Sequence, residues 1–353
     1  MKKILFALLV LLALPLLYLA SVIIYGTKVD YQPEEIEPIE VVNNPVQPIQ
    51  DSTFSFLIWN IGYAALGKEA DFFYDGGTMV HTPHALVQRY FEHIKSILKA
   101  NDTVDFILLQ EVDVQSTRSY KINEVDTFKN LMRAYGSAFA LNYNVPFVPM
   151  PLTNPLGKCK SGVISFFKNK CTVALRQGFV KENFEYPKKV FFLDRCMLET
   201  RFTLPNNKEL VVYNTHKSAY DLTGKLKQAE LVRMKYLIDI ERKMGNYVVV
   251  GGDWNQLPPG VSDTLFTSSP TLTSAPQSQI NSAFIDDTFA WVYDASTPTN
   301  RSLQYAYQQD STYKTLIDYF LISTNLSILS IKTSNLDFVS SDHQPVILHL
   351  KIK

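Results

Sequence analysis

The sequence predicts an α/β layered fold, and two patterns along the chain indicate it. Short apolar runs, several of them rich in β-branched or aromatic residues, alternate with amphipathic stretches. Such short runs are typical of buried strands, and their alternation with helices is typical of layered α/β proteins. Polar residues stand at the ends of many of the runs, which indicates a crevice where the strands end.

The elements are expected at the following places. The runs expected to form strands are 54–59, 106–109, 163–167, 198–202, 210–213, 247–250, 316–322 and 346–350. A helix is expected to begin at Pro83 with Thr82 as its cap, because proline suits the first helical position and threonine caps helices. A second helix is expected over about 225–244, which carries apolar residues on one side.

The length and charge of the chain limit its organisation. It has 353 residues, with 34 Lys and Arg against 34 Asp and Glu. This balance excludes reliance on a broad basic surface for holding long nucleic acid. Three cysteines are too few for a disulfide scaffold. No long proline-rich break interrupts residues 53–353, which are therefore expected to form one large domain.

Residues 1–26 are expected to be a membrane anchor, a single N-terminal transmembrane helix. Lys2 and Lys3 precede an apolar run over 4–25, which at about 1.5 Å per residue can cross a hydrocarbon core of about 30 Å. The lysines favour an amino end in the cytoplasm, so the domain is expected outside it, on the periplasmic or extracellular side. A cleaved signal peptide is the alternative, although its apolar region is usually shorter.

Residues 27–52 are expected to be an extended linker. They hold four prolines among glutamates and short polar residues. This composition favours extended, poorly packed chain.

Polar residues that suit metal and phosphate chemistry stand at the ends of the expected strands. They are Asn60, Gln110, Glu111, Asn214, His216, Asp253, Asn255, Asp318, Asp342 and His343. Each alone has an ordinary explanation as a turn residue, a solvated acid or a structural histidine. Asp318 is harder to explain in this way, because an ionised carboxylate in an apolar strand is costly unless it is paired. Together these residues indicate a catalytic crevice.

In these segments the chain resembles the endonuclease/exonuclease/phosphatase superfamily, which has the DNase I-like fold. The matching segments, in the family's order, are Ile58-Trp59-Asn60-Ile61-Gly62, Leu108-Leu109-Gln110-Glu111-Val112, Asn214-Thr215-His216, Gly252-Asp253-Trp254-Asn255, Ile317-Asp318-Tyr319 and Ser341-Asp342-His343-Gln344-Pro345. The resemblance implies a four-layer sandwich of two mixed β-sheets flanked by helices. It also implies an enzyme, a metal-dependent hydrolase of phosphate esters.

The residue types fit that chemistry. Glu111 and Asn60 offer the oxygen ligands that Mg²⁺ prefers, with Mn²⁺ as the other metal considered and Asp342 as a further carboxylate beside the metal. His343 is the expected general base, because the ordinary pKa of histidine suits proton abstraction at neutral pH. Asp318 is expected to hold the other ring nitrogen of His343.

The resemblance implies roles for four more residues. Asp253 and Asn255 orient the water and the phosphate or take part in metal binding, and His216 donates a hydrogen bond or a proton to the phosphate. Arg195 lies where relatives carry an arginine that contacts phosphate, with a surface ion pair to Asp194 or Glu199 as the alternative.

One segment departs from the family's pattern. Some nucleases of the family carry an acid, near the strand that here contains Ser161, which orients the histidine matched by His216. This chain has Lys160-Ser161-Gly162 at that place. A carbonyl or another residue is therefore expected to orient His216.

The expected function is a phosphodiesterase that acts outside the cytoplasm, in which a metal assists in-line attack by a water that His343 activates. The inositol-phosphatase branch is disfavoured, because residues 253–259 and 315–319 lack its arginine and its Cys-Asp-Arg motif. The expected substrate is a phospholipid or sphingolipid head group, or nucleic acid. The alternatives are an exported nuclease and a catalytically inactive, tethered binding module. The membrane is expected as a partner through the N-terminal segment, and no protein partner is predicted.

Overall fold

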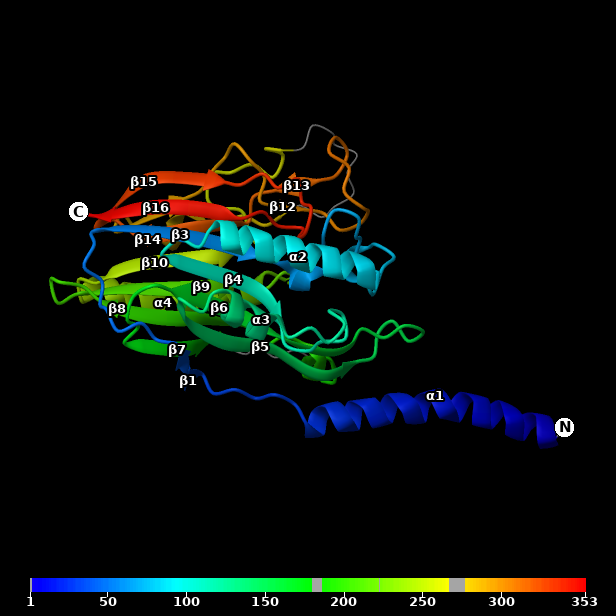
Figure 1. The fold of residues 1–353 in the computed structure, drawn as a ribbon. Coiled ribbons are helices and arrows are strands. Elements are labelled where there is room, and N and C mark those ends of the chain that lie inside the picture. The colour runs from blue at the N-terminus through cyan, green and yellow to red at the C-terminus, as the bar shows by residue number, and fades with distance from the viewer. Residues whose placement is uncertain (1, 180–185, 222, 267–276) are drawn as a thin grey trace.

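Two seven-stranded mixed sheets form the centre of the protein in the computed structural model, which describes the chain except for residues 1, 180–185, 222 and 267–276 (Figure 1). The first sheet has the order β1-β7-β8-β9-β10-β14-β11 and the second β15-β16-β3-β4-β6-β5-β2. Most neighbouring strands are antiparallel, and the parallel pairs are β9 with β10 and β3 with β4.

The strands have the following bounds. In the first sheet they are β1 (Ile36–Pro38), β7 (Val173–Gly178), β8 (Cys196–Thr203), β9 (Glu209–His216), β10 (Tyr247–Asp253), β14 (Asp318–Ser323) and β11 (Phe289–Val292). In the second they are β15 (Leu326–Thr333), β16 (Val346–Ile352), β3 (Thr53–Asn60), β4 (Phe106–Asp113), β6 (Gly157–Phe167), β5 (Gly136–Val148) and β2 (Val41–Val42). A separate small ribbon pairs β12 (Asn300–Arg301) with β13 (Lys314–Thr315).

The sheets pack face to face around an apolar core. Phe56, Leu108 and Phe167 of the second sheet belong to the same buried cluster as Val212 and Phe320 of the first. Burial of such side chains contributes about 1.5–3 kcal/mol each. Packing within this cluster holds the two sheets together.

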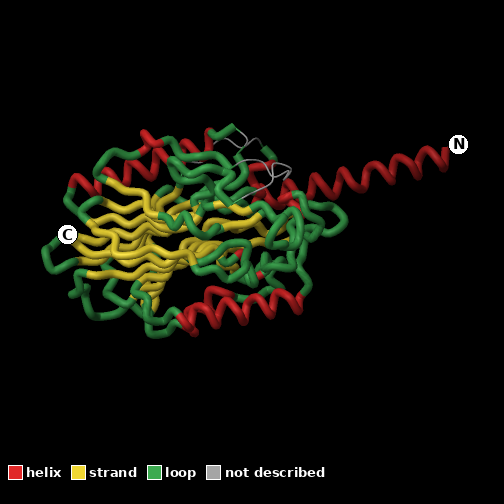
Figure 2. Tube along the Cα trace, turned by 90° about the horizontal axis from the view of Figure 1, so that it is seen from above, coloured by secondary structure: helices red, strands yellow, loops and turns green. Residues whose placement is uncertain are grey.

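Helices cover the outer faces of both sheets and complete four layers (Figure 2). Helix α2 (His84–Ala100) and the short α3 (Glu124–Leu131) pack on the second sheet, and α4 (Lys225–Lys243) packs on the first. The predicted sandwich of two mixed sheets flanked by helices is confirmed. The predicted cap of the first helix is wrong, because Pro83 occupies the cap position and the Thr82 hydroxyl donates to the carbonyl of Ala65 instead.

Helix α1 (Lys2–Lys28) extends away from the sandwich (Figure 1). Among the residues that the structure describes, no helix is both long enough and apolar enough to cross a membrane. The transmembrane helix predicted within residues 1–26, from run length and composition alone, is therefore not supported.

The stretch expected to be an extended linker, 27–52, contributes one short strand to each sheet. Strand β1 pairs with β7 at the edge of the first sheet, and β2 pairs with β5 at the edge of the second. Main-chain hydrogen bonds at sheet edges need little from the side chains, so a proline-rich stretch can still provide two short strands.

Candidate functional site

Three neighbouring strands of the first sheet place candidate catalytic residues side by side. His216 ends β9 and Asp253 ends β10, and these parallel strands pair the two residues directly. Asp318 begins β14, which runs antiparallel to β10 and pairs Asp318 with Asp253. Because neighbouring strands lie about 5 Å apart, the three side chains share one end of the sheet.

The second sheet supplies Asn60 and Glu111 at the same end. Asn60 ends β3, and its amide nitrogen donates to Asp253 Oδ2 at 3.0 Å and to Glu111 Oε1 at 3.3 Å. Glu111 lies where the β4–β6 register shifts, with a φ of +58°. Such a bulge re-aims a side chain and is common next to active sites. Asn60 therefore joins the two sheets across the cleft.

His343 and Asp318 form a buried hydrogen-bonded pair. His343 Nδ1 lies 2.8 Å from Asp318 Oδ2, and both side chains are almost fully enclosed. Burial alone would lower the pKa of His343, but the carboxylates of Asp318, Asp342 and Asp253 outweigh burial and raise that pKa well above its ordinary value. Burial raises the pKa of Asp318 to about 6, against the lowering effect of His343.

The other ring nitrogen of His343 faces the cleft. Nε2 lies 3.7 Å from Asp342 Oδ2 and 3.8 Å from Asp253 Oδ2. The amide nitrogen of Asn300 lies 2.9 Å from it. Asn300 therefore contacts the same ring nitrogen that lies nearest Asp342 and Asp253.

A tight turn holds Asn255 beside Asp253. Asn255 has a φ of +47°, its main-chain nitrogen donates to Asp253 Oδ1 at 2.9 Å, and its amide nitrogen donates to the Lys217 carbonyl at 2.8 Å. The buried Lys227 ammonium donates to the Asn255 carbonyl at 3.0 Å. Local hydrogen bonds of this kind let Asn adopt the left-handed conformation.

His216 has its Nε2 atom between two carboxylates, and no described acid holds its Nδ1 atom. Nε2 is 3.5 Å from both Glu111 Oε1 and Asp253 Oδ2, whereas Nδ1 is buried without a hydrogen-bond partner among the described residues. Burial, with Arg195, His343 and Arg118 nearby, lowers the pKa of His216 well below its ordinary value. A neutral imidazole suits hydrogen bonding to phosphate better than proton transfer to a leaving group.

Arg195 lies at the border of the cleft. Its Nη1 donates to the carbonyl of His216 at 3.4 Å. The structure thus brings all nine predicted site residues to one end of the sandwich. Arg195 is joined to the others through the carbonyl of His216 and not through the His343–Asp318 pair.

Solved structures share this architecture. An endonuclease/exonuclease/phosphatase from Beutenbergia cavernae superposes with a TM-score of 0.59 at 18% identity, over 85% of this chain and 72% of that one. ANGEL2, described as a 2′,3′-cyclic phosphatase and bound to adenosine-2′,3′-vanadate, superposes with a TM-score of 0.56 at 16% identity, over 90% and 99%. TDP2 from D. rerio, with a single-stranded DNA product, gives 0.53 at 13% identity, over 85% and 100%.

The chain has the endonuclease/exonuclease/phosphatase fold. No protein-family model and no curated protein sequence matches it. Its likeness to known proteins with this fold thus lies in structure and in the six short motifs, and the resemblance drawn from those motifs is confirmed for the fold.

The donor groups in this endonuclease/exonuclease/phosphatase fold fit a divalent metal. Burial raises the pKa of Asp342 to about 7, and the charge of Glu111 adds to the rise. A divalent cation would offset this repulsion between carboxylates. Asp253, Asp318 and His343 also offer ligand atoms within 4.8 Å of one another. The Asn60 amide oxygen accepts from the Gly62 nitrogen at 3.0 Å, and the amide nitrogen faces Glu111 and Asp253, so in this orientation Asn60 presents a donor to the two carboxylates.

Sequence reasoning missed Asn300, and it gave no role to two other residues that support the site, Gln110 and Asn214. Asn300 reaches His343 from the small β12–β13 ribbon, and no motif marks it. Gln110 and Asn214 were recognised only as parts of motifs. The amide nitrogen of Gln110 donates to Asn214 Oδ1 at 2.7 Å, which ties β4 of one sheet to β9 of the other beneath the site. The available signal for Gln110 and Asn214 was their position beside candidate catalytic residues on buried strands.

Replacing Asp318 with Asn is expected to shift the pH dependence of phosphoester hydrolysis. A general base acts only without its proton, so activity is lost as the pH falls below its pKa. Because the Asp318 carboxylate raises the pKa of His343, Asp318→Asn should move the acidic limb of kcat/KM to lower pH by about one unit or more. The maximum rate should fall about 10- to 100-fold, because the imidazolium loses its stabilising charge. A pH–rate profile in which the limb stays in place or moves to higher pH would contradict this role.

Proposed function

We propose that this chain is a divalent-metal-dependent phosphoesterase that cleaves a phosphodiester with a water deprotonated by His343. The His343–Asp318 pair carries the proposal. It is buried, hydrogen-bonded at 2.8 Å, and presents Nε2 towards the carboxylates of Asp342 and Asp253. A histidine held in this way by an acid is a general base in a fixed tautomer.

Each residue has a defined part in the reaction. Nε2 of His343 takes the proton of the attacking water, and Asp318 holds Nδ1–H and stabilises the imidazolium. Asn255, fixed by its turn, orients the phosphate or the water. His216, which is neutral, donates from Nε2 to a phosphoryl oxygen. Charge stabilisation by such fixed donors is usually the largest single contribution to catalysis of this kind.

Glu111, Asp342 and Asp253 would hold the metal, with Mg²⁺ as the first candidate. A metal bound there acts as a Lewis acid that neutralises charge on the phosphoryl oxygens. Carboxylate oxygens of this number suit Mg²⁺, and Mn²⁺ accepts the same ligands.

The proposed substrate is a phosphate ester of a nucleotide or nucleic acid. Two solved structures with this fold support it, because ANGEL2 is bound to adenosine-2′,3′-vanadate and TDP2 is bound to a single-stranded DNA product. Phospholipid and sphingolipid head groups are the second candidate, and near-neutral charge of the chain suits them.

The wild-type chain tests the proposal directly. Bis(p-nitrophenyl) phosphate, p-nitrophenyl phosphate, single-stranded DNA and sphingomyelin are assayed side by side with Mg²⁺, with Mn²⁺ and with EDTA. Metal-dependent hydrolysis of the diester, at least about tenfold faster than that of the monoester, is expected. No hydrolysis of any substrate with either metal would favour the inactive binding module instead.

A further inference from the structure

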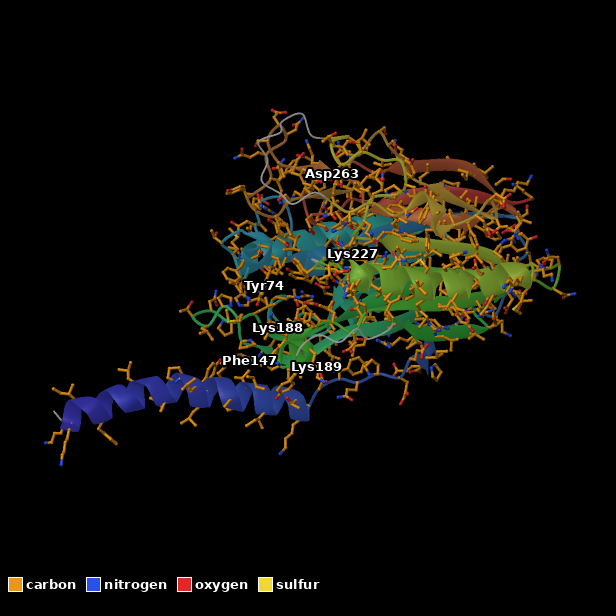
Figure 3. The ribbon with its side chains drawn as sticks, turned by 180° about the vertical axis from the view of Figure 1, so that it is seen from behind. Tyr74, Phe147, Lys188, Lys189, Lys227 and Asp263 are labelled. Atoms are coloured by element: carbon orange, nitrogen blue, oxygen red, sulfur yellow. The ribbon has the colours of Figure 1, made fainter. Side chains whose placement is uncertain are left out.

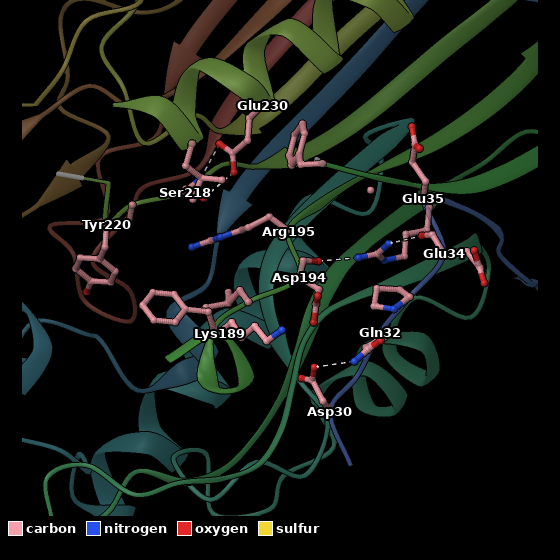
Figure 4. A pocket seen from close by; sticks show the side chains of 18 residues that line it. Asp30, Gln32, Glu34, Glu35, Lys189, Asp194, Arg195, Ser218, Tyr220 and Glu230 are labelled. Carbon is pink, nitrogen blue, oxygen red and sulfur yellow. Dashed lines mark hydrogen bonds between the residues drawn. The ribbon is translucent and has the colours of Figure 1, made fainter. Parts of the chain in front are cut away.

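A pocket of about 510 Å³ lies beside the candidate active site. Its near wall includes Arg195 and Ser218, which follows His216 by two residues (Figure 4). Its far wall is formed by residues 30 and 32–35 of the stretch expected to be a linker. A volume of this size suits one small organic group. The pocket thus shares Arg195 with the candidate site, and residues 30 and 32–35 line it as well.

The far wall, here called the N-terminal strap (residues 30–38), is held firmly to the domain. The Gly178 nitrogen donates to the Glu35 carbonyl at 2.7 Å, and Arg176 Nη1 donates to the Glu34 carbonyl at 3.2 Å. Arg233 lies 3.0 Å from the Glu35 carboxylate. Together with the β1–β7 pairing, these bonds make the strap a fixed part of the pocket.

Most of the acidic residues that line the pocket already have a partner. Glu35 pairs with Arg233, Glu230 accepts from Ser218 at 2.6 Å, and Asp30 accepts from Gln32 at 3.2 Å. Asp194 is not free either. Glu34 points away from Lys189 and Arg195 (Figure 4).

Two cations remain available to a ligand. The Lys189 ammonium has no partner among the residues that the structure describes, and the Arg195 guanidinium has only its 3.4 Å bond to the His216 carbonyl. Phe179 and Leu226 add apolar surface to the same pocket. Such a pocket suits an anionic group joined to the scissile phosphate through a sugar or similar moiety.

We propose that this pocket binds a second phosphate of the substrate, one nucleotide unit from the phosphate that is cleaved, with Lys189 as its recognition residue. The inference rests on the proposed phosphodiesterase function and deepens it. It favours an ester that carries two phosphates over a lipid head group that carries one. Affinity then comes from a local pair of cations, which agrees with the absence of net positive charge on the chain.

A matched pair of chromogenic esters tests the proposal. Thymidine 5′-(p-nitrophenyl phosphate) is compared with the same compound carrying a 3′-phosphate. In the wild type, the 3′-phosphate is expected to lower KM about tenfold, because hydrogen bonds to charged groups are among the stronger ones. Lys189→Gln should remove this advantage and leave the KM of the unphosphorylated ester unchanged.

Lys188→Gln is the control. Lys188 precedes Lys189 in the same short helix, η3 (Lys188–Phe191), and both are labelled in Figure 3. Lys188 is not among the residues that line the pocket. Equal effects of the two substitutions, or the same KM for both esters in the wild type, would overturn the second-phosphate site while leaving the phosphodiesterase proposal intact. Failure of the wild type to cleave either ester would instead contradict the proposed function.

Discussion

His343→Ala is expected to lower kcat for phosphodiester hydrolysis by about 10³-fold, within the range of general acid–base catalysis. The reason is the position of Nε2, which faces the cleft while Nδ1 is held by Asp318 at 2.8 Å. His216, the other buried histidine of the site, lies no nearer than 3.5 Å to the carboxylate oxygens of Glu111 and Asp253. The measurement is kcat and KM with bis(p-nitrophenyl) phosphate and Mg²⁺.

Two further variants separate lost chemistry from lost structure. His343→Ala leaves Asp318 buried without a partner, which costs stability. His343→Gln keeps a donor for Asp318 but cannot serve as a general base, so it should be equally inactive and closer to the wild type in Tm. His349→Ala, at an exposed position in β16, the strand that follows His343, should change neither property. Activity of His343→Gln within about threefold of wild type would rule out His343 as the base.

The side-chain pattern predicted the buried strands well because their apolar character is continuous. The expected strands at 54–59, 106–109 and 247–250 lie inside β3, β4 and β10. Strand β5 was missed, because Gly136–Val148 mixes polar residues and a proline with its apolar ones. Strand β15 was missed because much of it is exposed and carries serines and a lysine. For an edge strand such as β15, pairing through the main chain leaves little trace in the sequence.

Much of the candidate site was predictable because strand ends concentrate its residues. Asp318 stood out as a charge in an apolar run, and the structure shows the partner that makes its burial tolerable, His343. Asn300 was not predictable, because its contact with His343 depends on how a two-stranded ribbon folds back over the cleft. The wall that the N-terminal strap adds to the pocket was equally hidden, since linker composition predicts no docking.

Glu111→Gln is expected to reduce metal-dependent hydrolysis about 100-fold or more and to remove the stabilisation that Mg²⁺ gives the folded protein. The Glu111 carboxylate accepts one hydrogen bond, from Asn60, and lies close enough to Asp342 to raise the pKa of that residue. Glutamine keeps the shape and can still accept from Asn60, so the change removes mainly the charge. Loss of one of the few carboxylates that can hold Mg²⁺ should weaken binding strongly.

Thermal unfolding with and without Mg²⁺ distinguishes this role from a structural one. A ligand that binds only the folded state raises Tm, so Mg²⁺ should stabilise the wild type but barely affect Glu111→Gln. Without metal, Glu111→Gln should be at least as stable as the wild type, because the repulsion between Glu111 and Asp342 is gone. Glu92→Gln, an exposed position on α2, should behave as the wild type in both conditions. A full Mg²⁺-induced rise in Tm for Glu111→Gln would mean that the metal is held by Asp253 and its neighbours without Glu111.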